Sequence, residues 1–315
     1  MDDAILTTDN LSKSFGDVRA VRGVNFDICR GEIFSLLGPN GAGKTTTISM
    51  LSCLIEPTGG DAWVDGHSIR SEPQAVKEVI GVVPQEIALY QSLSARENLL
   101  FWGRMYGMGG KALQARIAEV LEIVGLADRA GDRIETFSGG MKRRINIAVG
   151  LLHRPKLVFM DEPTVGIDPQ SRRNILDTVK ELNAEGMTVL YTTHYMEEAQ
   201  ELSDRIGIID HGELIALGTQ IELAELVGQD EVLELQVGAT DASEALLQAL
   251  GQARGVREVS ANVGTVRLLA ADANAALAEV IAISNGHQAH ISGVSVEEPN
   301  LEAVFLHLTG RALRD

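Results

Sequence analysis

The stretch GPNGAGKT, residues 38–45, decides the fold of this chain of 315 residues. Its spacing is G-x4-G-K-[S/T]; a strand-like run at residues 32–37 precedes it, and a helix is expected from about Lys44 onward. A strand, a glycine loop and a helix in this order form a phosphate-binding loop. The alternative, a glycine turn beside a surface lysine, explains neither the spacing nor the flanking elements.

The chemistry of this loop predicts a nucleotide site. Glycines let backbone N–H groups surround phosphates, Lys44 reaches the β- and γ-phosphate oxygens, and Thr45 offers a hydroxyl to Mg²⁺. The positive end of the helix dipole lies under the same anion. The predicted nucleotide-binding residues of the loop are Gly38, Asn40, Gly41, Gly43, Lys44, Thr45 and Thr46.

Two carboxylates follow a short apolar run at residues 157–160, which is typical of a strand covered on both faces. Asp161 and Glu162 are therefore expected at the carboxyl edge of a strand, where ligands bind in open α/β sheets. We expect Asp161 to hold Mg²⁺, and Glu162 to accept the attacking water's proton or to orient that water. The alternative is a solvated acidic pair at a turn before Pro163, which is weaker beside a phosphate loop.

Three further side chains are candidates on local evidence only. Gln85 could reach Mg²⁺ or the attacking water, although an exposed glutamine in a turn is commoner. His194 could donate a hydrogen bond to the γ-phosphate, although a lone histidine at a strand end is more often structural. Phe15 could stack on a base, although a phenylalanine near a strand is usually part of the core.

A second glycine loop, Ser138-Gly139-Gly140, opens a basic segment that is predicted to be a helix. A helix start of this kind can bind an anion, and one phosphate loop already satisfies one nucleotide. We therefore expect this loop to cover the nucleotide of a second copy of the chain, related by a two-fold axis. The alternative is an ordinary helix N-cap at Ser138.

The pattern along residues 1–227 predicts a mainly parallel α/β sheet. Further strands are expected at residues 5–8, 24–28, 188–191 and 206–209. Between about residues 94 and 126 the period becomes helical, which predicts a helical insertion within a subdomain of about residues 90–150. The apolar stripe of this insertion is Leu113, Ile117, Val120, Leu121 and Val124.

The character of the sequence changes past about Leu226, and no lysine follows Lys180. Strands are expected at residues 231–237, 256–260 and 265–269 and within 289–296, with helices near 242–250 and 273–284. The order β-α-β-β-α-β is that of a ferredoxin-like domain. We therefore predict a nucleotide-binding domain at residues 1–227 and a small α+β accessory domain at residues 228–315.

Composition excludes several classes of partner. A net charge of −17 argues against nucleic acid and against a basic membrane anchor. Cys29 and Cys53 lack the spacing of a metal site or a disulfide framework. No apolar run approaches the roughly 20 residues of a spanning helix, so the chain is expected to be soluble.

Together these motifs resemble the nucleotide-binding subunit of an ABC transporter, over about the first 225 residues and in family order. The resemblance makes residues 38–45 the Walker A motif, residues 157–161 the Walker B motif, and Glu162 the catalytic glutamate. The other elements of the family that it assigns are the Q-loop at Gln85, the signature loop at Ser138-Gly139-Gly140, the D-loop at Gly166-Ile167-Asp168, the switch histidine His194 and the adenine-stacking aromatic Phe15. The fold implied is a P-loop NTPase of the ABC type, whose mainly parallel sheet carries an antiparallel β edge.

Two motifs depart from the family's commoner pattern. The signature reads FSGGM rather than LSGGQ, and the D-loop region reads TVGIDP rather than TSGLDP. Met141 and the tail at residues 298–310 are similar to drug-resistance exporters and A-type lipid transporters. The resemblance implies ATP and Mg²⁺ as cofactors, and as partners a second copy or a paralogous ATPase subunit and a separate transmembrane permease.

This resemblance also implies a location, on the cytoplasmic face of the membrane and held there only through the permease. The permease is expected to dock at residues 87–106, where Leu89, Tyr90, Leu93, Leu99, Leu100, Phe101 and Trp102 supply apolar surface. The rival hypothesis is an ABC-type ATPase acting on the ribosome or DNA, but the chain has neither a second cassette nor a long coiled coil. A third possibility is a P-loop kinase or GTPase, but such an enzyme would need neither the Ser138-Gly139-Gly140 loop nor His194.

Overall fold

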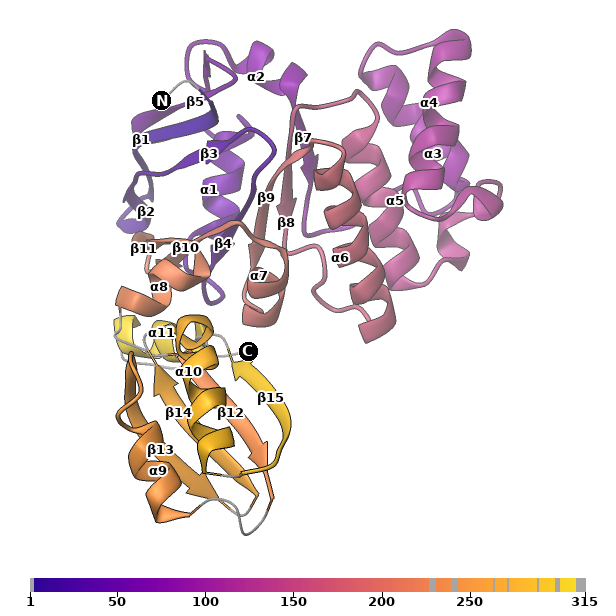
Figure 1. The fold of residues 1–315 in the computed structure, drawn as a ribbon. Coiled ribbons are helices and arrows are strands. Elements are labelled where there is room, and N and C mark those ends of the chain that lie inside the picture. Colours follow the sequence, from indigo (N-terminus) through magenta and orange to yellow (C-terminus); the bar gives the residue numbers. More distant parts are fainter. Residues whose placement is uncertain are drawn as a thin grey trace. The chain divides into compact units, whose positions relative to one another are not determined.

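A computed structural model describes residues 3–226, 231–238, 243–262, 264–270, 272–287, 289–297 and 301–309 (Figure 1). By its internal contacts the chain divides into two compact units between Thr219 and Gln220. The boundary predicted at residues 227 and 228 lies outside the described residues.

The first unit is built around a six-stranded sheet with the order β11-β10-β4-β9-β8-β7. Its strands are β4 (Ile33–Leu37), β7 (Ile80–Val83), β8 (Leu157–Asp161), β9 (Thr188–Thr193), β10 (Arg205–Asp210) and β11 (Glu213–Gly218). All neighbours are parallel except β10 and β11, so β11 is an antiparallel edge. Every residue of β4, β8 and β9 is buried, as expected for strands covered on both faces.

A second, antiparallel sheet precedes and follows the phosphate loop in the chain. It contains β1 (Ala4–Phe15), β2 (Val18–Val24), β3 (Asp27–Cys29), β5 (Gly59–Val64) and β6 (His67–Ser68). The single strand predicted at residues 24–28 is wrong, because β2 ends at Val24 and β3 begins at Asp27. The long strand β1 pairs with both. β2 pairs with the C-terminal half of β1 and β3 with its N-terminal half, so the break lies where the pairing changes from one half of β1 to the other.

Helices cover the six-stranded sheet and form the insertion. The helices next to the sheet are α1 (Lys44–Leu51), α2 (Pro73–Val79), α6 (Pro169–Ala184) and α7 (Met196–Leu202). The insertion contains α3 (Ala95–Met105), α4 (Gly110–Ile123) and α5 (Gly139–Leu151), with short 3-10 turns at Ala127–Arg129 and Ile134–Thr136. All five residues of the predicted stripe on and beside α4 are buried. In Figure 1 α5 lies between the sheet and the pair α3 and α4.

The second unit contains a four-stranded antiparallel sheet and helices, two of which pack against the sheet. Its elements are α8 (Gln220–Leu226), β12 (Glu231–Val237), α9 (Glu244–Leu250), β13 (Val256–Asn262), β14 (Thr265–Ala270), α10 (Ala273–Gly286), β15 (Ile291–Glu297) and α11 (Leu301–Thr309). From β12 to β15 the order is the predicted β-α-β-β-α-β, and the strand order β13-β14-β12-β15 agrees with a ferredoxin-like sheet.

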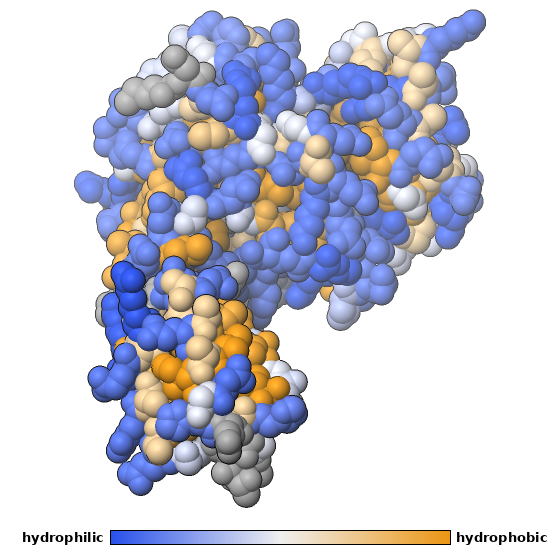
Figure 2. All heavy atoms as spheres, viewed as in Figure 1, coloured by the Kyte–Doolittle hydropathy of each residue, from blue (hydrophilic) through white to orange (hydrophobic). Residues whose placement is uncertain are grey.

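The sequence did not predict α8 or α11. In the tail compared with A-type exporters, residues 298–300 and 310 lie outside the described residues. Figure 2 shows hydrophobic residues gathered on this unit, and Val294 of β15 is 42% exposed.

Candidate functional site

The phosphate loop joins β4 to α1 and is packed too closely for side chains at two of its glycines. A Cβ on Gly38 would lie 2.1 Å from the carbonyl oxygen of Ile209. Gly43, at the N-terminus of α1, has a φ of +109°, and a Cβ there would lie 2.7 Å from the carbonyl oxygen of Ala20. The loop is thus held between β10 of the six-stranded sheet and β2 of the second sheet. Its backbone N–H groups lie at the start of α1.

Lys44 is buried at the bottom of this loop. Its Nζ donates hydrogen bonds to the carbonyl oxygens of Gly38, at 2.6 Å, and Pro39, at 3.0 Å, and lies 2.9 Å from Oε1 of Glu162. A pocket of about 180 Å³ opens here. It is lined by Ala20, Asn40, Gly41, Gly43, Lys44, Thr45, Thr46, Gln85 and Glu162.

Asp161 ends β8 and is positioned by two hydroxyls. Oγ1 of Thr192 donates to Oδ1 of Asp161 at 2.8 Å, and the Thr45 side chain also hydrogen-bonds to this carboxylate. Burial raises the pKa of Asp161 above the ordinary carboxyl value, and the two hydroxyls offset part of that rise. The Asp161 carboxylate, the Thr45 hydroxyl and the side-chain amide oxygen of Gln85, which lines the same pocket as Thr45, are hard oxygen ligands. These residues therefore fit Mg²⁺ completed by phosphate and water.

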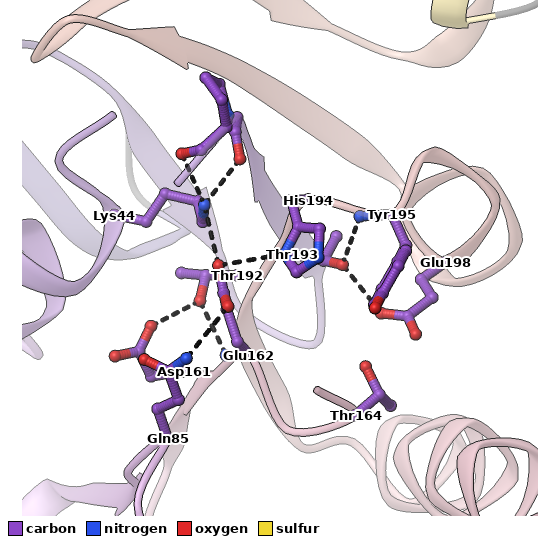
Figure 3. Close-up of polar contacts among 12 residues, drawn as sticks. Lys44, Gln85, Asp161, Glu162, Thr164, Thr192, Thr193, His194, Tyr195 and Glu198 are labelled. Carbon is purple, nitrogen blue, oxygen red and sulfur yellow. Dashed lines mark hydrogen bonds and ion pairs between the residues drawn. The ribbon is translucent and has the colours of Figure 1, made fainter. Parts of the chain in front are cut away.

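Glu162 lies directly after β8 with a φ of +44°, an unusual conformation for a residue other than glycine. Its backbone N–H donates to Oγ1 of Thr192 at 3.0 Å, and this contact helps to hold the turn. Strained backbone of this kind clusters at functional sites. The turn directs the carboxylate toward Lys44 rather than along the strand (Figure 3).

Two of the candidates left open by the sequence lie beside this carboxylate. Nε2 of Gln85 donates to Oε2 of Glu162 at 3.3 Å. Nδ1 of His194 lies 3.4 Å from Oε1 of the same carboxylate, and the histidine is only 8% exposed. Three chain segments that are far apart in sequence therefore converge on Glu162 (Figure 3).

The Ser138-Gly139-Gly140 loop does not line this pocket. Oγ of Ser138 accepts a hydrogen bond from the N–H of Met141 at 3.2 Å, so Ser138 is the N-cap of α5. A Cβ on Gly140 would lie 2.0 Å from Oγ of Ser171 in α6, which leaves no room for another residue. The N-cap is thus present, and it does not conflict with a role toward a second copy.

Asp168 and Phe15 also lie away from the pocket lining. Asp168 is the N-cap of α6 and accepts a hydrogen bond from the N–H of Ser171 at 2.9 Å. Hydrogen bonds from Ser171 lower the pKa of Asp168. Phe15, at the end of β1, is 52% exposed with Nζ of Lys13 5.1 Å from its ring centroid, so it is not a core residue.

Thr192 also belongs to the site although the sequence did not predict it, because its hydroxyl bonds both Asp161 and the backbone of Glu162. Its only sequence signal is a hydroxyl residue at the end of a buried strand near His194. That signal does not reveal that β9 lies next to β8.

The site combines a phosphate loop, a buried lysine and a carboxylate at the end of a parallel strand, which defines a P-loop nucleoside triphosphatase. The sequence pattern of the ABC transporter family matches residues 21–165. A linearmycin resistance ATP-binding protein of Bacillus subtilis is 50% identical over 313 residues, covering 99% of this chain and 100% of that protein. The chain therefore belongs to the ATP-binding proteins of the ABC transporter family and is an ABC-type ATPase.

Other relatives support the same family. A daunorubicin resistance ATP-binding protein of Streptomyces coeruleorubidus is 39% identical, over 98% of this chain and 97% of the relative. A Nod factor export ATP-binding protein of Ralstonia nicotianae is 36% identical, over 99% and 95%. These names are of resistance and export proteins and do not favour the ribosome-acting alternative.

Solved structures show the same fold. An ATP-binding subunit of an ABC transporter superposes with a TM-score of 0.64 at 29% identity, covering 71% of this chain and 93% of that one. A dimeric ATP-binding cassette with bound ADP and Pi has a TM-score of 0.61 at 29% identity, covering 68% and 98%. None of the helices in the described residues has the length and apolar character of a membrane span.

Proposed function

We propose that this chain hydrolyses Mg²⁺-ATP to drive export through a separate membrane permease. The observation that carries the proposal is the convergence of Lys44, Gln85 and His194 on the carboxylate of Glu162 inside the phosphate-loop pocket. The export assignment is supported by full-length similarity to resistance and export proteins.

Each side chain has a distinct proposed role. Glu162 accepts the proton of the attacking water, and His194 donates a hydrogen bond toward the γ-phosphate. Lys44 binds the β- and γ-phosphate oxygens. Thr45, Gln85 and Asp161 hold Mg²⁺, which when bound neutralises developing charge on the phosphates.

The contact between Lys44 and Glu162 also suggests how the base is prepared. Both side chains are nearly fully buried, and a buried charge is costly unless it is paired. A phosphate group that binds Lys44 competes with Glu162 for the lysine ammonium. The Glu162 carboxylate is then available to the attacking water.

A second copy, or a paralogous ATPase subunit, completes each site in this proposal. Ser138, Gly139, Gly140 and Asp168 cover the partner's ATP, and Phe15 stacks on the adenine of its own chain's ATP. Support comes from the position of the first four outside the pocket and from the dimeric relative. The membrane is reached only through the permease, on its cytoplasmic side.

The proposed docking surface lies on residues 87–106. Tyr90 is 48% exposed, Met105 67% and Tyr106 43%. The ring of Phe101 packs edge-on against Tyr90 with 4.8 Å between centroids. The expectation that Leu99 contributes to this surface is wrong, because Leu99 faces the core between α3 and its neighbours and is fully buried.

We expect Tyr90→Glu to separate docking from catalysis. A charge at an apolar contact opposes binding of a permease helix, while the exposed side chain contributes little to the fold. ATPase activity and the unfolding temperature of the isolated chain should stay unchanged, and co-fractionation with the permease in membranes should fall. The control is Leu54→Glu, at an exposed apolar residue outside the surface. Intact complex and transport in the Tyr90 variant would place the docking surface elsewhere.

We also propose that the domain of residues 1–227 folds without the accessory domain. The two buried apolar cores of the first unit use residues 5–209, and the core of the second uses residues 233–289. A chain that ends after residue 227 should unfold cooperatively and bind ATP with an affinity like that of the full chain. Calorimetry and nucleotide titration measure both. Loss of folding in the shortened chain would show that the boundary is wrong.

A further inference from the structure

The turn that carries His194 is closed by a hydroxyl on one side of it. The backbone N–H of Tyr195 donates to Oγ1 of Thr193 at 2.9 Å, across the histidine. The Thr193 hydroxyl in turn donates to Oε2 of Glu198 at 2.8 Å. A threonine hydroxyl has one proton, so the bond to Glu198 leaves a lone pair free to accept from Tyr195. Glu198 therefore holds the Thr193 hydroxyl in the orientation in which its oxygen accepts the bond that closes the turn.

Glu198 lies on α7 and is only 2% exposed. Its Oε2 also accepts from the hydroxyl of Tyr191 at 2.9 Å, and Nε of Arg172 lies 3.6 Å from its Oε1. Burial, followed by the charge of Glu198, raises the pKa of Tyr191 well above the ordinary phenol value, so this hydroxyl keeps its proton and donates. A buried carboxylate is costly to desolvate, and its three polar partners offset this cost only because the fold places all of them around Glu198.

Glu198 is not among the residues that line the pocket around Lys44. Glu198 instead contacts Thr193, the residue before His194, and so reaches the pocket only through the turn that carries His194 (Figure 3). The ring of Tyr195 packs on His194 with 4.2 Å between centroids, and the guanidinium of Arg172 lies 4.4 Å from the Tyr195 ring centroid. Thr193 and Tyr195, the two neighbours of His194, are thus both fixed by this buried network.

We propose that Glu198, acting through the Thr193 hydroxyl, is a positioning residue that holds His194 against Glu162. The inference rests on the proposed role of His194 in hydrolysis. Removing the network lets the imidazole leave its place 3.4 Å from the Glu162 carboxylate, while the phosphate loop and Lys44 are unaffected. Turnover depends on this positioning, and ATP binding does not.

Thr193→Val is the sharpest variant, because valine keeps the shape and removes only the hydroxyl. We expect kcat of the full chain to fall about tenfold or more, since small misplacements of a catalytic group are costly, with KM for ATP almost unchanged. Thr193→Ser should restore kcat, and Glu198→Gln should lower it. Glu197→Gln is the matched control, because Glu197 is the exposed neighbour of Glu198 on the same helix.

The deciding measurement combines each change with His194→Ala. If the network acts only through His194, Thr193→Val lowers kcat in the native chain and causes no further loss beside His194→Ala. An additive loss, or native kcat in the Thr193 variant, would overturn the inference. Native kcat in His194→Ala alone would instead refute the proposed role of His194. If the glutamine variant of Glu198 does not fold, the Thr193 pair gives the same decision.

Discussion

Replacing Glu162 with glutamine is expected to remove most ATP turnover while ATP binding is kept. Glutamine has the same shape but cannot accept the proton of the attacking water. A general base contributes about 10²–10⁴-fold to such a reaction, so kcat should fall by about that factor. Lys44 and the phosphate loop, which bind the nucleotide in the proposed mechanism, keep their own residues, although Lys44 loses the charge of its Glu162 partner. Phosphate release and nucleotide titration on the full chain measure the two quantities.

The same variant should accumulate as a dimer in ATP. A closed interface that is completed by ATP persists while the γ-phosphate remains, and mass action then favours the dimer. Light scattering with ATP and with ADP measures the mass in each case. Glu185→Gln, at an exposed glutamate outside the pocket, should retain native turnover and serve as the control. Native hydrolysis in Glu162→Gln would contradict the assignment of the base.

The parts of the site that can be predicted from sequence are those set by local sequence or by the general geometry of parallel sheets. The phosphate loop is local, because the spacing from Gly38 to Thr45 and the flanking strand and helix lie within one continuous segment. Asp161 and Glu162 were predictable because the carboxyl ends of parallel strands meet at one edge of a sheet. Local sequence left Gln85 and His194 open, because what places them is the neighbouring strands rather than their own surroundings.

Features that depend on pairing between distant segments could not be predicted. Thr192 contacts Asp161 only because β9 lies beside β8, and nothing near Thr192 in sequence indicates that neighbour. The break between β2 and β3 has the same origin, since it depends on which half of β1 each one pairs with. Glu198 looks like one of several acidic residues on a surface helix, and only the fold reveals that it is buried.

ATPase activity should depend on a site that two copies of the chain share. The variants Lys44→Ala and Ser138→Arg are each expected to be nearly inactive alone. The first removes the buried ammonium from its own pocket. The second places a long side chain at the position that, in the proposed dimer, faces the partner's nucleotide, so each homodimer has two defective sites. Mixing the two proteins should restore part of the activity, because one site of the heterodimer pairs an intact Lys44 with an intact Ser138.

The mixing experiment needs two controls. Subunit exchange is first shown by co-purification of differently tagged chains. Ser138 also caps α5, so Ser138→Arg is expected to lower the free energy of unfolding by about 1 kcal/mol. Ser138→Asn is the matched variant, because asparagine keeps the cap and its side chain is smaller than that of arginine. The asparagine variant should unfold at nearly the native temperature.

Recovery in the mixture depends on the geometry of the shared site. If Ser138 acts within its own chain, the heterodimer has one site damaged at Lys44 and another damaged at Ser138. No site is then intact, and mixing cannot raise the activity above that of the separate variants. Absence of recovery after proven exchange would therefore argue against the shared site, or show that both sites must fire together. Strong hydrolysis by Ser138→Arg alone, at concentrations where it is monomeric, would contradict the shared site directly, because a monomer has no partner loop to cover its ATP.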